Sequence, residues 1–352
     1  MPSARLLGST EALAVRYDVA LLDLDGVVYI GRDEVVGASA ALADAREHGM
    51  RLAFVTNNAA RPPGVVAAHL SDLGVPATAA EVITSAQAAA HYLAERLPSG
   101  SRILVLGTTG LVEALTERGL VPVSSADAQP QAVVQGYSPD TDWRMLAEGA
   151  VAIRRGLPWI ATNLDATVPS PRGPLPGNGS LVAALRHATG ATPVSTGKPD
   201  PTMHRETVER SGARSPLVVG DRLDTDIEGA DAVGCASMLV LTGVTSAADL
   251  LAAPGTHRPG YVARDLRGLL TPHPAPVDAD GTVTCGGWSA VARGDQLHLA
   301  GSSDAERRVP NQGDSSLDAL RTLCVAAWNS DLTGCTADDD AAQSVLAEFG
   351  LS

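Results

Sequence analysis

The stretch that decides the fold is Tyr17-Asp18-Val19-Ala20-Leu21-Leu22-Asp23-Leu24-Asp25-Gly26. It predicts a short apolar strand that ends in two aspartates and a glycine, and the glycine lets the backbone turn sharply. If the strand simply continued, Asp23 and Asp25 would point to the same side. Two carboxylates at the end of a buried strand repel each other by a few kcal/mol unless a cation or a proton intervenes. The pair therefore indicates a divalent metal site or acid–base chemistry, although Asp and Gly are also common in ordinary turns.

Length and composition limit the class of protein. The chain has 352 residues, enough for two or three domains, and its 45% hydrophobic content fits a soluble globular protein. A formal net charge of −14 argues against nucleic acid and anionic membranes as partners. We find no apolar run of transmembrane length, no signal-peptide pattern and no CxxC pair among the four cysteines. We therefore expect a cytoplasmic protein, and a homo-oligomer stays open.

Lys198 is the only lysine of the chain, and the other 25 of the 26 basic residues are arginine. Arginine can replace lysine at most solvated positions, but not where a compact, strongly hydrated ammonium must fit a tight space. Lys198 is therefore a candidate site residue, and survival by chance is the alternative.

Polar groups follow several other predicted strands. Thr56 ends the strand that begins at Arg51, and Asp221 and Asp226 follow the strand 216–219, with a helix expected over 226–232. Strands that alternate with helices predict a doubly wound parallel sheet, in which ligands bind at the carboxyl ends of the strands. The alternative for Thr56 and the asparagines after it is that they only cap the next helix.

A second α/β pattern interrupts the first between residues 103 and 162. We therefore expect a core domain over 1–84 and 191–270 and an inserted α/β cap over 85–190. A Pro-rich linker over 271–280 leads to a small α+β module over 281–352, with helices at 315–330 and 337–349. The module is either a truncated acyltransferase-like unit or a dimerisation element, and its role is unknown.

The segment 163–180 is a long loop rich in proline and glycine, a kind of loop that is usually functional. It carries the polar residues Asn163, Asp165, Arg172 and Asn178 and contains no aromatic residue. The first three of these are candidate substrate-binding residues, and a flexible surface excursion is the alternative.

Together, four strand ends carry polar groups in a fixed order: Asp23-Leu24-Asp25-Gly26, Thr56, Lys198 and Gly220-Asp221-Arg222-Leu223-Asp224-Thr225-Asp226. This set resembles the four motifs of the haloacid dehalogenase superfamily of phosphatases. The segments Val55-Thr56-Asn57-Asn58 and Gly197-Lys198-Pro199 look like the p-nitrophenyl phosphatase-like branch, which carries a large α/β cap between the second and third motifs. Within that branch, residues 17–270 look closest to the actinobacterial glycerol 3-phosphate phosphatases.

The resemblance implies a phosphomonoesterase that uses Mg²⁺ and an aspartyl-phosphate intermediate. Asp23 would be the nucleophile, and Asp25 would serve as general acid and then as general base. Asp23, the backbone carbonyl of Asp25 and Asp221 would hold the Mg²⁺, and Asp226 would orient that shell.

The same resemblance implies that Thr56, the Asn57 amide and Lys198 stabilise the transferring phosphoryl group. Asn58 is a further substrate-binding candidate. A loop without aromatic residues suits a small polyol phosphate, so glycerol 3-phosphate is the expected substrate. The alternatives are 2-phosphoglycolate, another sugar phosphate and pyridoxal phosphate.

Two other classes of protein share parts of this pattern. A nucleotide-dependent oxidoreductase would have a similar sheet, but it should show GxGxxG after its first strand, where this chain has DxDG. A non-catalytic regulatory or assembly protein built on the same fold is the second alternative, and the tail would be the part that it uses.

Overall fold

The computed structural model describes residues 6–168, 172–301 and 315–352. The described residues form two compact units: the first lies within residues 1–30, 34–52 and 213–352, and the second lies within residues 31–33 and 53–212. The chain passes from one to the other within β4 (Arg51–Thr56). Within the described ranges, we find no helix that is both long enough and apolar enough to span a bilayer.

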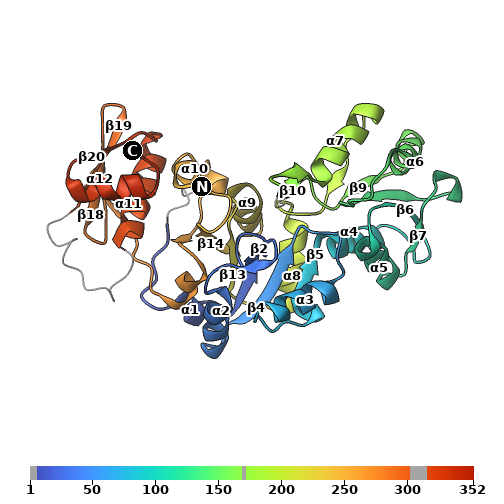
Figure 1. The fold of residues 1–352 in the computed structure, drawn as a ribbon, viewed down its shortest axis with the longest axis horizontal. Helices are drawn as coiled ribbons and strands as arrows, with labels where there is room; N and C mark the ends of the chain where they lie inside the picture. Colours follow the sequence, from blue (N-terminus) through green and yellow to red (C-terminus); the bar gives the residue numbers. More distant parts are fainter. Residues whose placement is uncertain (1–5, 169–171, 302–314) are drawn as a thin grey trace. The chain divides into compact units, whose positions relative to one another are not determined.

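A parallel sheet forms the centre of the first unit, with strand order β15-β14-β13-β1 (Figure 1). All four residues of β1 are buried, and so are the last four of β13. Strands of a parallel sheet covered on both faces consist of nearly continuous apolar runs, which is why the sequence predicts β1 and β13. The bounds of the strands are β1 (Val19–Leu22), β13 (Pro216–Gly220), β14 (Ala236–Val240) and β15 (Tyr261–Ala263).

Short helices surround this sheet, and two short strands follow β1. The helical segments are α1 (Leu13–Arg16), α2 (Ala38–Glu47), the π-helix η3 (Leu223–Ile227), α9 (Glu228–Ala232), α10 (Ala247–Leu251), η4 (Gly255–His257) and η5 (Leu266–Leu270). The short strands are β2 (Tyr29–Ile30) and β3 (Asp33–Glu34).

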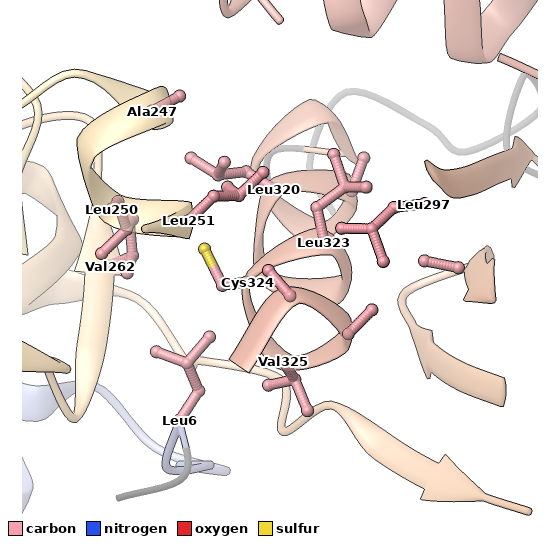
Figure 2. Packing of buried hydrophobic residues seen from close by; sticks show 14 of the residues in the cluster. Leu6, Ala247, Leu250, Leu251, Val262, Leu297, Leu320, Leu323, Cys324 and Val325 are labelled. Carbon is pink, nitrogen blue, oxygen red and sulfur yellow. The ribbon is translucent and has the colours of Figure 1, made fainter. Parts of the chain in front are cut away.

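The carboxyl-terminal module belongs to the same unit and has a sheet of its own. Its strand order is β16-β17-β18-β19-β20, antiparallel except for the parallel pair β19–β20. Figure 2 shows α11 between Leu250 and Val262 on one side and Leu297 on the other, so one apolar core joins the module to the first sheet. The bounds are β16 (Val277–Ala279), β17 (Thr282–Cys285), β18 (Trp288–Arg293), β19 (Gln296–Gly301), α11 (Ser315–Ser330), β20 (Cys335–Ala337) and α12 (Asp340–Glu348).

In the second unit, β4 pairs in parallel with β5 (Val82–Thr84), and a separate parallel sheet has the order β12-β9-β8-β6-β7. Val133 and Val134 of β8 pack into two different apolar cores, as expected for neighbours on a strand. Helices α4 and α5 therefore cover one face of this sheet, and α6 and α7 cover the other (Figure 1).

The strands of this second sheet are β6 (Arg102–Leu106), β7 (Val121–Val123), β8 (Ala132–Gln135), β9 (Trp159–Ala161) and β12 (Val194–Ser195). The helical segments of the unit are α3 (Pro63–Asp72), η1 (Ala79–Glu81), α4 (Ser85–Ala94), α5 (Thr109–Glu117), η2 (Ala126–Ala128), α6 (Trp143–Arg154), α7 (Asn178–Thr189) and α8 (Pro201–Ser211).

Two segments near the carboxyl terminus, 271–280 and 337–349, differ from the expectation. The segment 271–280 is not a linker throughout, because Val277–Ala279 form β16 and pair with β17. The helix expected over 337–349 begins at Asp340, and β20 precedes it. Both strands are three residues long, too short for a clear alternation of polar and apolar residues.

The expected loop 163–180 also contains regular structure. Strands β10 (Thr167–Val168) and β11 (Leu175–Pro176) pair in antiparallel fashion, and α7 begins at Asn178. Residues 169–171 of this segment lie outside the described residues. Helix α7 is not predicted from the sequence, because glycines and prolines dominate the residues before it. The proposed boundaries of core and cap stay a prediction, since the second unit combines residues from both.

Candidate active site

An acidic cluster lies where β1 and β13 end. The two strands run in parallel with Leu22 opposite Val219, and the Asp23 N–H donates to the Val219 carbonyl at 2.8 Å. Asp221 follows β13 directly, and Asp226 lies in η3. Carboxylate oxygens of Asp23, Asp221 and Asp226 all lie within 4.8 Å of one another. The structure therefore brings together three residues that the sequence suggests as metal ligands.

The chemistry of this cluster suits a hard divalent cation. Asp221 and Asp226 are each only 1% exposed, and Asp23 is half-buried. Three negative charges at this spacing in a partly dehydrated site repel one another strongly unless a cation or protons compensate them. Oxygen-only donor sets of this kind are what Mg²⁺ prefers. The residues present therefore fit the ion that the resemblance implies.

Asp226 reaches the cluster through a single turn of π-helix. The expected helix over 226–232 is in fact η3 over Leu223–Ile227 followed by α9, and π-turns are frequent at functional sites. The Arg222 N–H donates to Asp226 Oδ2 at 3.3 Å. A Cβ on Gly220 would lie 2.2 Å from the Asp226 Cβ. Only glycine at position 220 therefore allows Asp226 to approach β13 this closely.

The segment Thr242–Ser246 after β14, here called the clamp loop, holds Asp221 in place. The Val244 N–H donates to Asp221 Oδ2 at 2.7 Å, and Thr245 Oγ1 donates to the Asp221 carbonyl at 2.6 Å. Thr242 Oγ1 donates to the Gly26 carbonyl at 2.5 Å. The clamp loop thus touches both the turn after Asp25 and the carboxylate of Asp221.

The clamp loop is not among the functional segments predicted from the sequence. Its signal in the sequence is a Thr-Gly pair directly after a buried strand, which is common in turns. The glycine is required here, because a Cβ on Gly243 would lie 1.9 Å from Asp221 Oδ2.

Asp25 lies in a turn and not on a continuing strand. β1 ends at Leu22, and the Leu24 carbonyl accepts a hydrogen bond from the Val28 N–H at 2.9 Å. The Gly26 N–H donates to the Tyr29 carbonyl at 2.8 Å, with Gly26 at a φ of +87°. The backbone therefore reverses here, which only a glycine does without strain. Asp25 is half-buried, and its carboxylate is not part of the group of three acids found in the described ranges.

In the second unit, Thr56 and Lys198 both lie at the end of β4. Thr56 is the last residue of β4 and is 3% exposed, and its Oγ1 accepts from the Asn58 N–H at 3.1 Å. Lys198 is 4% exposed, and its Nζ donates to the Val55 carbonyl at 3.3 Å. The lone lysine is thus a buried cation beside the strand that carries Thr56.

The side chain of Asn57 fixes the backbone of Lys198. Asn57 Oδ1 accepts from the Lys198 N–H at 2.8 Å, and Nδ2 donates to the Lys198 carbonyl at 3.2 Å. The same Nδ2 lies 3.2 Å from Asp165 Oδ1, to which it donates. Gly197 permits this arrangement, because a Cβ there would lie 2.8 Å from Asn57 Oδ1.

The remaining substrate-binding candidates are divided between several roles. Asn163 is buried, and its Nδ2 donates to the Asn57 carbonyl at 2.7 Å. Asn58 Oδ1 accepts from the Ala60 N–H at 2.8 Å in a local turn, whereas Pro62 is the N-cap of α3 and no side chain caps that helix, so the capping alternative is not confirmed. Arg172 is exposed between β10 and β11. The structure therefore joins Asn57, Asn163 and Asp165 in one network, with Asn58 next to it in the chain.

Three family models match the chain. A model described as haloacid dehalogenase-like hydrolase matches residues 20–121, and a second, HAD-hydrolase-like model matches residues 195–269. A model described as GCN5-related N-acetyltransferase like domain matches residues 285–351, which agrees with the acyltransferase-like interpretation of the tail.

Relatives with known names cover most of the chain. A D-glycerol 3-phosphate phosphatase from Mycobacterium tuberculosis is 44% identical over 326 residues, which is 91% of this chain and 88% of that protein. An acid sugar phosphatase from Staphylococcus saprophyticus is 35% identical over 256 residues, 72% of this chain and 97% of that protein.

Solved structures show the same relationship. The crystal structure of a glycerol phosphate phosphatase from Mycobacterium tuberculosis in complex with magnesium is 43% identical, with a TM-score of 0.88 over 97% of this chain and 99% of that chain. A 4-nitrophenylphosphatase from Thermotoga maritima is 31% identical, with a TM-score of 0.68 over 73% of this chain and 98% of that chain. These similarities confirm the expected α/β fold with a Rossmann-like core and a cap. The chain belongs to the haloacid dehalogenase-like hydrolase family.

Proposed function

We propose that this protein is a magnesium-dependent phosphomonoesterase that hydrolyses glycerol 3-phosphate through an aspartyl-phosphate. The observation that carries the proposal is the buried cluster of Asp23, Asp221 and Asp226 at the ends of two parallel strands. The relatives support it, since two of them carry the names D-glycerol 3-phosphate phosphatase and acid sugar phosphatase.

The metal site would consist of the carboxylates of Asp23 and Asp221 and the backbone carbonyl of Asp25, with Asp226 orienting the shell. Mg²⁺ held by these residues would neutralise the clustered carboxylates and polarise a phosphate oxygen. The clamp loop holds Asp221 by its carboxylate and its carbonyl, so the donor set is preorganised.

Two carboxylates divide the chemistry. An oxygen of Asp23 attacks phosphorus and forms a new O–P bond while the ester P–O bond breaks. Asp25 donates its proton to the leaving alcohol oxygen and becomes a carboxylate. In the second step Asp25 takes a proton from water, whose oxygen attacks phosphorus and displaces Asp23. The products are the alcohol and inorganic phosphate, and both aspartates return to their starting protonation states.

Thr56, the Asn57 N–H and Lys198 would stabilise the charge on the transferring phosphoryl group, which is the main source of catalysis in such reactions. The proposal requires these residues to act on the same phosphoryl group as Asp23. Burial of Lys198 supports this role, because a cation shielded from water interacts strongly with an anionic transition state.

Glycerol 3-phosphate is the proposed substrate because the segment 163–180 offers polar groups and no aromatic ring. Asp165 and Arg172 are the proposed contacts to the glycerol part of the substrate. Asn163 stabilises the loop by hydrogen bonds to the Asn57 carbonyl and from the Asp165 N–H. The net charge of −14 favours small phosphate esters over nucleic acid or anionic membranes as partners, and a cytoplasmic location is proposed with it. A homo-oligomer remains a prediction.

A panel of phosphate esters tests the substrate. We expect the highest kcat/KM for glycerol 3-phosphate and lower values for 2-phosphoglycolate, other sugar phosphates and pyridoxal phosphate. The Asp23→Asn variant should lose turnover of every ester while its circular dichroism stays unchanged. If wild-type protein with Mg²⁺ hydrolysed no member of the panel, the non-catalytic alternative would replace this proposal.

A further inference from the structure

We propose that the carboxyl-terminal module is a positioning element for Asp221, and that it acts through Trp328, α10 and the clamp loop. The inference rests on the proposed magnesium site. It gives a role to a part of the chain that contributes no residue to the group of acids found in the described ranges.

The first link joins Asp221 to the clamp loop. Three hydrogen bonds connect them: Val244 N–H to Asp221 Oδ2 at 2.7 Å, and Thr245 Oγ1 and N–H to the Asp221 carbonyl at 2.6 and 3.2 Å. Since Gly243 also packs directly against this carboxylate, a shift of the clamp loop must shift Asp221. The clamp loop therefore sets the position of a metal ligand.

The second link joins the clamp loop to α10. Ser246 is both the last residue of the clamp loop and the N-cap of α10, where its Oγ accepts from the Asp249 N–H at 3.2 Å. Helix α10 has only five residues, and a helix of this length does not hold its shape without tertiary packing. The position of the clamp loop thus depends on whatever α10 packs against.

The third link joins α10 to the module. Leu250 and Leu251 are at most 2% exposed and belong to one apolar core with Leu320, Leu323 and Cys324 of α11 (Figure 2). The Trp328 Nε1–H donates to the Leu250 carbonyl at 3.0 Å, and the Arg258 guanidinium lies 5.3 Å from the centre of the Trp328 ring. α11 is therefore the surface that locates α10.

A further contact, between Arg321 and β15, fixes the position of α11. Arg321 is 6% exposed and donates to the Val262 carbonyl of β15 at 2.7 Å and to Asp318 Oδ1 at 2.7 Å. The module is thus docked both on α10 and on an edge strand of the first sheet. A rigidly docked module transmits its position to the clamp loop and so to Asp221.

Two tryptophans of the module allow a matched test. Trp328 and Trp288 are 7% and 4% exposed, and each donates its Nε1–H at 3.0 Å. Trp328 donates to α10, whereas Trp288 donates to Ser315 Oγ within the module. Phenylalanine keeps most of the ring packing at either position and removes the donor, so both variants should fold.

The experiment measures Mg²⁺ affinity of the full chain by titration calorimetry, and the rise of the unfolding temperature with Mg²⁺ as a second readout. We expect Trp328→Phe to weaken Mg²⁺ binding about fivefold to tenfold and to reduce that rise, because α10 loses the side-chain hydrogen bond that it accepts from α11. We expect Trp288→Phe to change the affinity less than twofold. Equal effects of the two variants, or no effect of Trp328→Phe, would overturn the inference.

Two further variants separate a failure of the inference from a failure of the metal site. Gly243→Ala places a Cβ against Asp221 Oδ2, and Asp221→Asn removes a charge, so both should weaken Mg²⁺ binding more than tenfold. If both do so while Trp328→Phe behaves like Trp288→Phe, the site stands and the coupling is wrong. If Asp221→Asn binds Mg²⁺ as the wild type does, the proposed site itself is wrong, and the inference with it.

Discussion

Replacing Asn57 by alanine removes the side chain that fixes the backbone of Lys198. Three hydrogen bonds disappear: the one accepted from the Lys198 N–H, the one donated to the Lys198 carbonyl and the one donated to Asp165 Oδ1. Asn58 offers a matched control, because it is the same residue type, is also half-buried, and makes a bond to the Ala60 N–H that does not involve Lys198.

The magnitude follows from the number of bonds. Each is worth about 1 kcal/mol, so the two to Lys198 account for ~2 kcal/mol and all three for ~3 kcal/mol. If the full loss falls on the placement of the Lys198 ammonium in the transition state, kcat/KM should drop about 30-fold to 160-fold. Asn58→Ala should cost less than fivefold.

The assay is steady-state hydrolysis of glycerol 3-phosphate at saturating Mg²⁺, together with the Mg²⁺ affinity of each variant. We expect the loss for Asn57→Ala to appear mainly in kcat, with Mg²⁺ affinity unchanged, because Asn57 is not one of the proposed metal ligands. A rise of KM with kcat unchanged would show that the side chain binds substrate instead. Equal kinetics for Asn57→Ala and Asn58→Ala would refute the positioning role.

Three other changes have defined outcomes. Lys198→Arg should lower kcat about 100-fold or more, because a planar guanidinium cannot occupy the buried place of the ammonium; near wild-type turnover would make the lone lysine a coincidence. Gly220→Ala should abolish the stabilisation by Mg²⁺, since its Cβ would lie 2.2 Å from the Asp226 Cβ; an unchanged unfolding temperature with Mg²⁺ would contradict this. Burial lowers the pKa of His273 from 6.5 to about 4. The hydrogen bond to the Gly268 carbonyl opposes this shift, and the nearby Arg321 cation adds to it. Because the unfolded state binds this proton more readily than the folded state, stability should fall as the pH decreases. About 3 kcal/mol of unfolding free energy, fully present above pH 6.5, should be lost as the pH falls to 4. Urea titrations at both pH values should show a smaller loss for His273→Gln.

The strands that carry the site were predictable because their signal is local. β1, β4 and β13 are continuous apolar runs, and each is followed at once by its polar residues, so their places at strand ends follow from the sequence. Lys198 was a candidate for a reason that does not depend on the fold: it is the single lysine among 26 basic residues.

The supporting contacts were not predictable, because they depend on close approach between distant segments. Gly243 lies 22 residues beyond Asp221 in the chain, and only the packing of β14 beside β13 brings the two together. Asn57 and Lys198 are 141 residues apart in the sequence, so no local pattern around Asn57 predicts the hydrogen bonds between them. The π-turn that carries Asp226 has no helical periodicity of its own, and a helix over 226–232 was the natural expectation.

The most direct test of the account is a search for phosphate on Asp23. Asp25→Asn protein should still accept the phosphoryl group from p-nitrophenyl phosphate, whose leaving group needs no acid, but should hydrolyse the intermediate slowly. After acid quenching and proteolysis, mass spectrometry should find phosphate on the peptide that contains Asp23, and hydroxylamine should release it. Release of p-nitrophenol over many turnovers with that peptide unmodified would contradict the proposal that Asp23 is the nucleophile.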